Sequence, residues 1–179
     1  MHTYICLLRG INVSGQKKIK MVDLKVSLEK LNFKEIATYI QSGNIVFKSE
    51  IDSTTELEKH IHDIILKDFG FDVPTLVKTS KEVRDAFEQN PFEKDATKDP
   101  KLFYVVFLKN KPASENIAHL KTYDYSPEVY VLKDKIIYFY AANGAGKAKM
   151  SNNFFENKLK TQATTRNWRT THKLVELSH

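Results

Sequence analysis

The sequence lacks several features that would place it in a well-known class of protein. Its single cysteine, Cys6, cannot form a disulfide within the chain, as is typical of proteins in a reducing cytosol. No apolar run approaches the ~18 residues that a membrane-spanning helix needs. The segment after Met1 lacks the basic stretch and apolar core of a signal peptide. We therefore expect a cytoplasmic protein without a membrane segment.

Motifs of common enzyme classes are also missing. The six histidines show no metal-ligand spacing, and His60 and His62, two apart on a predicted helix, point to different faces. No Gly-x-Ser-x-Gly elbow occurs, and the carboxylates are dispersed along helix faces. Cys6 lies inside an apolar run, which favours a small core residue over a nucleophile. We expect neither a metal nor another cofactor.

The composition predicts a folded, basic chain. Hydrophobic residues make up 41% and aromatic residues 11% of the 179 residues, enough for a substantial core. The net charge of +6 is unevenly placed. Residues 1–20 hold four basic side chains and no acid, and residues 143–179 hold seven basic and two acidic ones. This pattern indicates either solubility alone or attraction to phosphates and nucleic acid.

The first half reads as strand, helix, strand, strand, helix, strand. Apolar runs and alternation predict strands at 3–8, 35–40, 44–48 and 73–78. Apolar residues at helical spacing predict helices beginning at Met21 and after Ser53, which has capping-box spacing with Glu56. Gly70 ends the second helix, Ser42-Gly43 forms a hairpin turn, and a short helix covers 80–89.

A polar segment at residues 90–101 with two prolines is the candidate linker. After it the pattern restarts, with strands at 102–108, 128–132 and 135–141. Helices follow Pro112 and begin near Asn152 and near Thr165, where Thr164 and Thr165 are candidate N-caps. The fold predicted is α+β, with two ferredoxin-like units at 1–98 and 99–179, helices on one face of each antiparallel sheet. The fourth strand of the second unit is short or missing, so we expect that unit to be incomplete.

The ferredoxin-like topology predicts a polar site at one edge of the first sheet. Right-handed crossovers bring the end of the first strand beside the hairpin that joins the second and third strands. The edge would then bring together guanidinium, amide, hydroxyl and backbone N–H groups beside a helix N-terminus. Such groups bind phosphate or carboxylate. A loop that simply packs on the hairpin is the alternative. The residues concerned are Arg9, Gly10, Asn12, Ser14, Gln41, Ser42 and Asn44, and Lys20 and Tyr39 are further candidates for ligand binding.

Two further segments are candidates for anion binding. The glycine loop at 143–149 departs from a nucleotide-hydrolase phosphate loop, because Ala141 replaces the first glycine and Ala148 replaces the magnesium-binding hydroxyl. A simpler nest of backbone N–H groups with Lys147 and Lys149 remains an interpretation, as does a plain connector. In the last helix, Arg166, Asn167 and Arg169 would place two guanidinium groups three residues apart, to fork around a phosphate or to form surface salt bridges.

Aromatic residues are concentrated in the second half, where Tyr138 and Tyr140 share one strand face. Such a face stacks bases in RNA-recognition modules. In the first unit, however, Asn44 and Val46 stand where that signature requires aromatic residues. Packing against another element is therefore the favoured interpretation of the tyrosines.

Three segments together resemble the bacterial domain-of-unknown-function 1697 family. They are Arg9-Gly10-Ile11-Asn12-Val13 with Ile19-Lys20-Met21 and Asp23-Leu24, then Thr38-Tyr39-Ile40-Gln41-Ser42-Gly43-Asn44, and Thr165-Arg166-Asn167-Trp168-Arg169-Thr170. The resemblance covers essentially the whole chain. It implies a bacterial protein and singles out these segments, but it brings no established activity.

Three hypotheses of function follow. The first is a binding protein for an anionic partner, either a phosphate-bearing small molecule or nucleic acid. The second is a metal-free enzyme acting on a phosphorylated or carboxylated metabolite, with Arg9 and Arg166 as anion clamps and Tyr39 as acid or base. The third is a structural or protein-interaction module in which the polar residues join the two halves.

Overall fold

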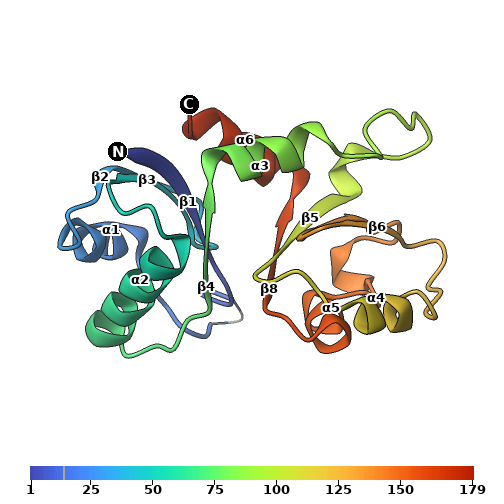
Figure 1. The fold of residues 1–179 in the computed structure, drawn as a ribbon, viewed down its shortest axis with the longest axis horizontal. Coiled ribbons are helices and arrows are strands. Elements are labelled where there is room, and N and C mark those ends of the chain that lie inside the picture. The colour runs from blue at the N-terminus through green and yellow to red at the C-terminus, as the bar shows by residue number, and fades with distance from the viewer. Residues whose placement is uncertain (14) are drawn as a thin grey trace. The chain divides into compact units, whose positions relative to one another are not determined.

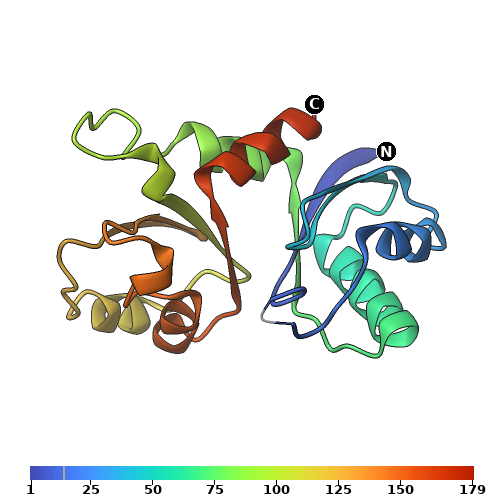
Figure 2. The same cartoon turned by 180° about the vertical axis from the view of Figure 1, so that it is seen from behind.

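The chain forms two compact units in the computed structural model, which describes residues 1–13 and 15–179 (Figures 1 and 2). The first unit comprises Met1–Asp85 with Lys173–His179, and the second comprises Ala86–His172. The predicted domain boundary at 98/99 stays a prediction. None of the described helices is long and apolar enough to cross a membrane.

The first unit is a four-stranded antiparallel sheet with strand order β2-β3-β1-β4. Helices α1 and α2 lie on the same face of this sheet (Figure 1). Between them and the sheet lies a core that includes Tyr4, Cys6, Phe47 and Ile61. The elements are β1 His2–Leu8, α1 Met21–Glu29, β2 Lys34–Tyr39, β3 Asn44–Ser49, α2 Thr54–Phe69, β4 Thr75–Thr79 and the first part of α3 Ser80–Glu88, which continues into the second unit. The predicted βαββαβ order and the core position of Cys6 are confirmed.

Local signals set the helix ends of this unit. Ser53 Oγ accepts a hydrogen bond from the Glu56 backbone N–H at 3.2 Å and so caps α2. Gly70 ends the helix with a φ of +73°, the left-handed conformation that glycine adopts without a steric cost. At α3, Thr79 Oγ1 accepts from Glu82 N–H while Glu82 accepts from Thr79 N–H, a reciprocal capping box.

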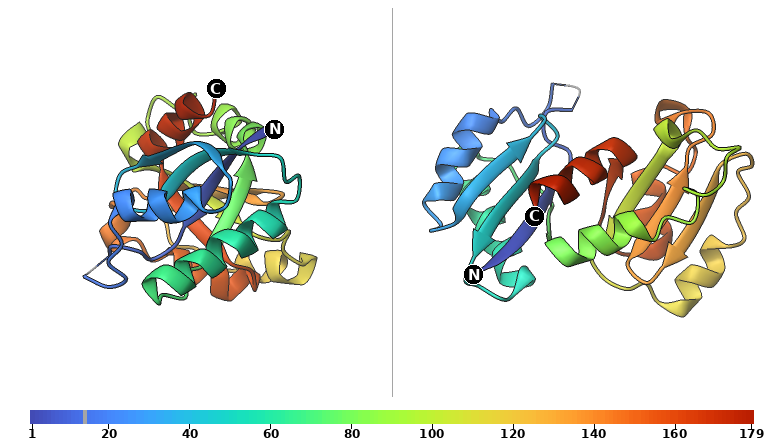
Figure 3. Two further views of the ribbon diagram at one scale, coloured as in Figure 1. Left: turned by 90° about the vertical axis from the view of Figure 1, so that its left-hand side faces the viewer. Right: turned by 90° about the horizontal axis from the view of Figure 1, so that it is seen from above.

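The second unit repeats this architecture with strand order β6-β7-β5-β8, which can be followed in Figure 3. Phe155 and Leu159 of α5, Leu120 of α4 and alternate strand residues such as Val106 and Phe139 form its core. The elements are 3₁₀ turn Pro100–Leu102, β5 Phe103–Leu108, α4 Ser114–Leu120, β6 Val129–Lys133, β7 Ile136–Tyr140, 3₁₀ turn Ala145–Lys147, α5 Asn152–Leu159, β8 Ala163–Asn167 and α6 Trp168–Leu177.

The expectation of an incomplete second unit is wrong, because β8 supplies its fourth strand. Residues 163–167 pair antiparallel with β5, and Val105 lies opposite Arg166. The last helix therefore begins at Trp168, not near Thr165. The two adjacent threonines have β-branched side chains that fit a pleated strand. Thr164 and Thr165 can cap a helix, but here they pair with β5, which lies far away in the sequence.

Carboxylates from the second helix of each unit satisfy backbone groups of an edge strand. In the first unit, Glu58 Oε1 accepts from the Val77 N–H of β4 at 3.1 Å. In the second, Glu156 Oε1 accepts from the Ala163 N–H of β8 at 2.7 Å, and Asn152 Nδ2 donates to the Ala163 carbonyl at 3.1 Å. Unpaired edge groups invite pairing with other chains, so these contacts close the edge locally.

The segment predicted as a linker is packed onto the second sheet through one aromatic residue. Phe92 is buried, and its ring centroid lies 6.0 Å from that of Phe103 and 6.3 Å from that of Tyr140. Asn90 Oδ1 accepts from Phe92 N–H at 3.0 Å and fixes the turn that directs the ring inward. Residues 90–101 therefore form a segment fixed by Phe92, although their composition is that of a linker.

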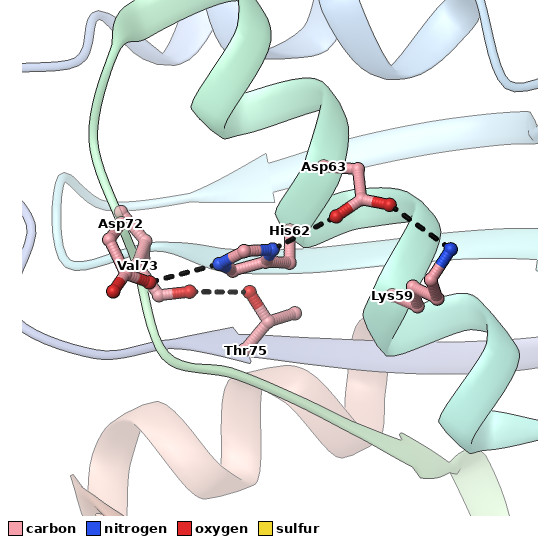
Figure 4. A network of polar contacts seen from close by, with 6 residues as sticks. All are labelled: Lys59, His62, Asp63, Asp72, Val73 and Thr75. Carbon is pink, nitrogen blue, oxygen red and sulfur yellow. Dashed lines mark hydrogen bonds and ion pairs between the residues drawn. The ribbon is translucent and has the colours of Figure 1, made fainter.

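A histidine on α2 bridges two carboxylates within the first unit (Figure 4). His62 Nε2 lies 2.9 Å from Asp72 Oδ1, and Nδ1 lies 3.1 Å from Asp63 Oδ1. Asp63 also lies 3.4 Å from Lys59 Nζ. The hydrogen bond to Asp72, and then that to Asp63, raises the pKa of His62 above its ordinary value. Asp72 stands between α2 and β4, so the protonated imidazole ties the helix to the segment that follows it.

We expect this tie to make stability depend on pH. Because the folded state raises the pKa of His62, its contribution is fully present below the unfolded value of about 6.5 and is lost as pH rises through the folded pKa. His62→Gln should lower the free energy of unfolding at pH 5.5 by up to about 1 kcal/mol, the scale of exposed ion pairs, and by less at pH 8.5. Urea unfolding at both pH values measures this.

His60→Gln is the matched control, because it removes an imidazole from the same helix and leaves the contact between His62 and Asp72 intact. A loss for His62→Gln that is equal at both pH values would show that the imidazole contributes by packing and not by charge.

Candidate functional site

The loop after β1 and the hairpin between β2 and β3 meet in the first unit, as predicted. Asn12 makes the contact with its side chain. Its Nδ2 donates to the Gln41 carbonyl at 2.8 Å and to the Ile19 carbonyl at 2.9 Å, while its Oδ1 accepts from Ile19 N–H at 2.9 Å. The amide thus closes the loop and fastens it to the hairpin, so these bonds occupy groups that were predicted to bind a ligand.

The hairpin is organised by Asn44, whose side chain is buried. Its Nδ2 lies 2.9 Å from Ser42 Oγ and donates to the Tyr39 carbonyl at 3.1 Å. Beside it, Gly43 has a φ of +79° and accepts a hydrogen bond from Leu8 N–H through its carbonyl. A Cβ at Gly43 would lie 2.6 Å from Leu8 Cβ and 2.9 Å from Ile11 Cδ1, so only glycine permits this approach.

The basic groups of this edge border the contact. Arg9 is half-buried and its backbone N–H donates to the Pro74 carbonyl at 3.0 Å, whereas Gly10 and Lys20 are exposed. The Lys20 carbonyl accepts from Leu24 N–H in the first turn of α1. Ser14 lies outside the described residues. For Asn12 and Asn44 the geometry favours the alternative of a loop packed on a hairpin, and ligand binding by this set stays a prediction.

The glycine loop of the second unit already binds an anion, and that anion is the chain's own Glu128. Glu128 is 6% exposed, and its two carboxylate oxygens accept from Lys149 N–H at 2.8 Å and Met150 N–H at 3.0 Å. Lys147 is exposed on the 3₁₀ turn, and Lys149 Nζ lies 5.6 Å from the ring centroid of Tyr125. Sequence reasoning missed Glu128, because nothing in its local pattern indicates that it is buried.

The predicted placement of Arg166 and Arg169 on one face of the last helix is wrong, whereas phosphate binding by either side chain stays a prediction. Arg166 lies on β8 and is buried, with Nη1 donating to Thr164 Oγ1 at 2.8 Å and to the Thr165 carbonyl at 2.9 Å. Arg169 lies on α6 and is exposed. The strand-to-helix transition at Asn167 separates the two, so they are not neighbours on one helix face.

Asn167 and Arg169 instead line a cleft of about 650 Å³ in the second unit. Asn167 caps α6, its Oδ1 accepting from Thr170 N–H at 2.8 Å. Lys101 and Arg169 supply positive charge, and Glu93 supplies negative charge. No ion pair of Lys101 or Arg169 is found within residues 1–13 and 15–179. The remaining lining residues are Phe87, Pro100, Trp168 and His172.

Three rings form a stack along one wall of this cleft. The centroid of Phe87 lies 4.3 Å from that of Trp168 at an interplanar angle of 20°, and 5.0 Å from that of His172 at 15°. Trp168 also meets Phe103 edge-on at 6.2 Å. Phe87 and Trp168 are half-buried and His172 is exposed, so aromatic surface faces the cleft beside the two cations.

Tyr138 and Tyr140 pack against other side chains, as the favoured interpretation expected. Tyr138 is 2% exposed, and Tyr140 lies within 6.0 Å of Phe103 and 6.3 Å of Phe92 between ring centroids. These rings therefore contribute to packing in the structure. In the described part of the chain, no group of three or more His, Cys, Asp or Glu side chains could hold a metal ion.

Replacing Gly43 should cost much more stability than replacing Gly10. Both glycines have positive φ, but a Cβ at Gly10 would meet nothing within 4 Å. Gly10→Ala should therefore lose about 1–2 kcal/mol for the left-handed backbone alone. Gly43→Ala should lose about 2–4 kcal/mol, because overpacking against Leu8 and Ile11 adds to that cost. Chemical denaturation measures both losses. Equal losses would show that Leu8 and Ile11 move aside for the added methyl group without a loss of stability.

Comparison with other proteins gives a structural neighbour and a family. Over 99% of both chains it is similar in structure to the conserved bacterial protein SP0830 from Streptococcus pneumoniae, with a TM-score of 0.73 and 22% sequence identity. This likeness shows the fold. No curated protein matches the chain. The sequence profile described as "Protein of unknown function (DUF1697)" matches residues 1–138, and the segment 165–170 lies beyond that match. The chain therefore belongs to the DUF1697 family.

Proposed function

We propose that the chain binds a small phosphate-bearing ligand with a planar ring in the cleft of the second unit. The observation that carries this proposal is the position of Lys101 and Arg169 beside the stacked rings of Phe87, Trp168 and His172. Guanidinium and ammonium groups bind phosphate oxygens by charge-assisted hydrogen bonds, and flat aromatic surfaces stack on planar rings. We propose a cytoplasmic location, where a chain with one cysteine needs no disulfide.

The start of α6 adds a second source of favourable electrostatics. The first N–H groups of a helix have no partner within it and carry partial positive charge. Asn167 Oδ1 accepts the hydrogen bond from Thr170 N–H, and the side-chain amide nitrogen of Asn167 takes no part in that bond. In the first unit, by contrast, the amides of Asn12 and Asn44 are bonded within the loop and the hairpin. The geometry thus supports the second unit as the better place for an anion.

The test is a binding series with adenosine monophosphate, adenosine, ribose 5-phosphate and inorganic phosphate. We expect adenosine monophosphate to raise Tm most, because it offers both ring and phosphate, and a ligand of the folded state stabilises by mass action. Arg169→Gln should weaken its binding by about 10- to 100-fold, which corresponds to loss of one charged hydrogen bond of 1.5–3 kcal/mol. Calorimetric titration measures the change in Kd.

Lys25→Gln is the control, because it removes one exposed charge from α1, outside the cleft. The proposal fails if none of the four compounds shifts Tm, or if Arg169→Gln responds as wild type does. A single-stranded oligonucleotide that binds when the monophosphate does not, with affinity falling steeply as salt rises, would point to nucleic acid instead.

A further inference from the structure

The outer strand of the second sheet, β6, turns unpaired backbone groups to the free edge. Two bonds of the central strands fix which residues do so: Leu108 N–H donates to the Lys135 carbonyl, and Ala141 N–H donates to the Leu102 carbonyl. Odd-numbered residues of β7 therefore bond to β5 and even-numbered ones to β6. Tyr138 lies opposite Val131, so this pair is bonded. The N–H and C=O groups of Tyr130 and Leu132 consequently point away from the sheet.

The other three edge strands differ from β6. The β4 edge receives Glu58, and the β8 edge receives Glu156 and Asn152. The β2 edge carries an irregularity in register after Lys34, with a φ of +51° at Glu35, which disturbs any added strand. For Tyr130 and Leu132, no outward backbone hydrogen bond is found across residues 1–13 and 15–179. The β6 edge is therefore open to strand pairing.

A cleft of about 800 Å³ runs along this open edge. Five consecutive residues, 128–132, line it. Successive side chains of a strand point to opposite faces, so a cleft that touches all of them follows the edge itself. Its walls include apolar and aromatic groups from Ile117, Tyr125 and Met150. An apolar side chain of an added strand would lie against these groups.

Among the described residues that line this cleft, one cation is available to an occupant. Glu128 is bound by two backbone N–H groups, and Asp124 accepts from Ser126 N–H at 2.9 Å. Asp134 lies 3.3 Å from Lys111 Nζ. Lys121 is exposed at the cleft, and no ion pair of its side chain is found in the described parts of the chain. An acidic group on the occupant would complement it.

We propose that β6 binds an extended peptide segment of a partner protein, which adds a strand to the second sheet. The peptide backbone pairs with Tyr130 and Leu132, an apolar side chain fills the cleft, and an acidic side chain lies near Lys121. Main-chain bonds give such complexes affinity, and pockets for alternate side chains give them specificity. This site shares no lining residue with the cleft proposed for the phosphate-bearing ligand, so either can fail without the other.

The probe is an immobilised library of acetylated pentapeptides with alternating apolar residues and either Glu or Gln at one end. We expect the full chain to bind a subset, and Glu peptides to bind more tightly than their Gln counterparts. Methylating alternate peptide nitrogens should abolish binding, because it removes the main-chain donors. The proposal is overturned if no peptide binds, or if methylation has no effect.

Two variants at one position separate the backbone from the side chain. Leu132→Pro removes an outward N–H, a change tolerated on a free edge, and should weaken the best peptide at least tenfold. Leu132→Ala keeps that N–H and loses only side-chain surface, so it should weaken the same peptide less than Leu132→Pro does. Should the proline variant fail to fold, the methylated peptides test the same bonds. Wild-type affinity in a folded Leu132→Pro variant would contradict the proposal.

Lys121→Gln should remove the preference for Glu over Gln, while Lys94→Gln, at an exposed lysine outside the cleft, should keep it. A preference that survives Lys121→Gln overturns the assignment of the acidic group. Size-exclusion chromatography with light scattering measures the molar mass and so tests whether a second copy of the chain occupies the edge. A dimer that Leu132→Pro dissociates would show that a second copy of this chain, and not a partner peptide, occupies the edge.

Discussion

The fold depends on side-chain carboxylates that satisfy backbone N–H groups at buried and partly buried positions. Glu58 and Glu156 each bind an edge strand from the second helix of their unit, and Glu128 binds the end of the glycine loop. A buried N–H without a partner costs about 1–3 kcal/mol, and a buried carboxylate without one costs more. Each contact therefore removes both costs, because the N–H group and the carboxylate are partners of each other. These acids act structurally, and Glu128 does so in the wall of the cleft proposed for a peptide.

The order of elements in the first unit was predictable because its signals are local. Ser53, Gly70 and the pair of Thr79 and Glu82 mark helix ends through bonds that span only a few residues. The meeting of the loop with the hairpin was also predictable, since it follows from topology. In the second unit β8 was not, because its threonines fit both a cap and a strand. Only pairing with β5, more than fifty residues earlier, decides between them.

The candidate sites illustrate the same limit. Asn12 and Asn44 have the residue types of a ligand site, yet their side chains bond within the loop and the hairpin, mainly to the backbone. Arg166 became a buried strand residue through the same pairing with β5 that ordered β8. Asn167 and Arg169 remained at a cleft, but its aromatic wall comes partly from Phe87, eighty residues earlier in the chain. Composition identifies such groups, and tertiary contacts determine their neighbours.

The return of residues 173–179 to the first unit has a consequence for synthesis. Residues 1–85 leave the ribosome first, but Leu174 and Val175, buried residues of that same unit, are made about ninety residues later. At 5–20 residues per second, this leaves an interval of roughly 5 to 20 seconds. During it the nascent first unit lacks the last seven residues of its own compact structure. The whole second unit is translated within that interval, so it has the opportunity to fold before the first is complete.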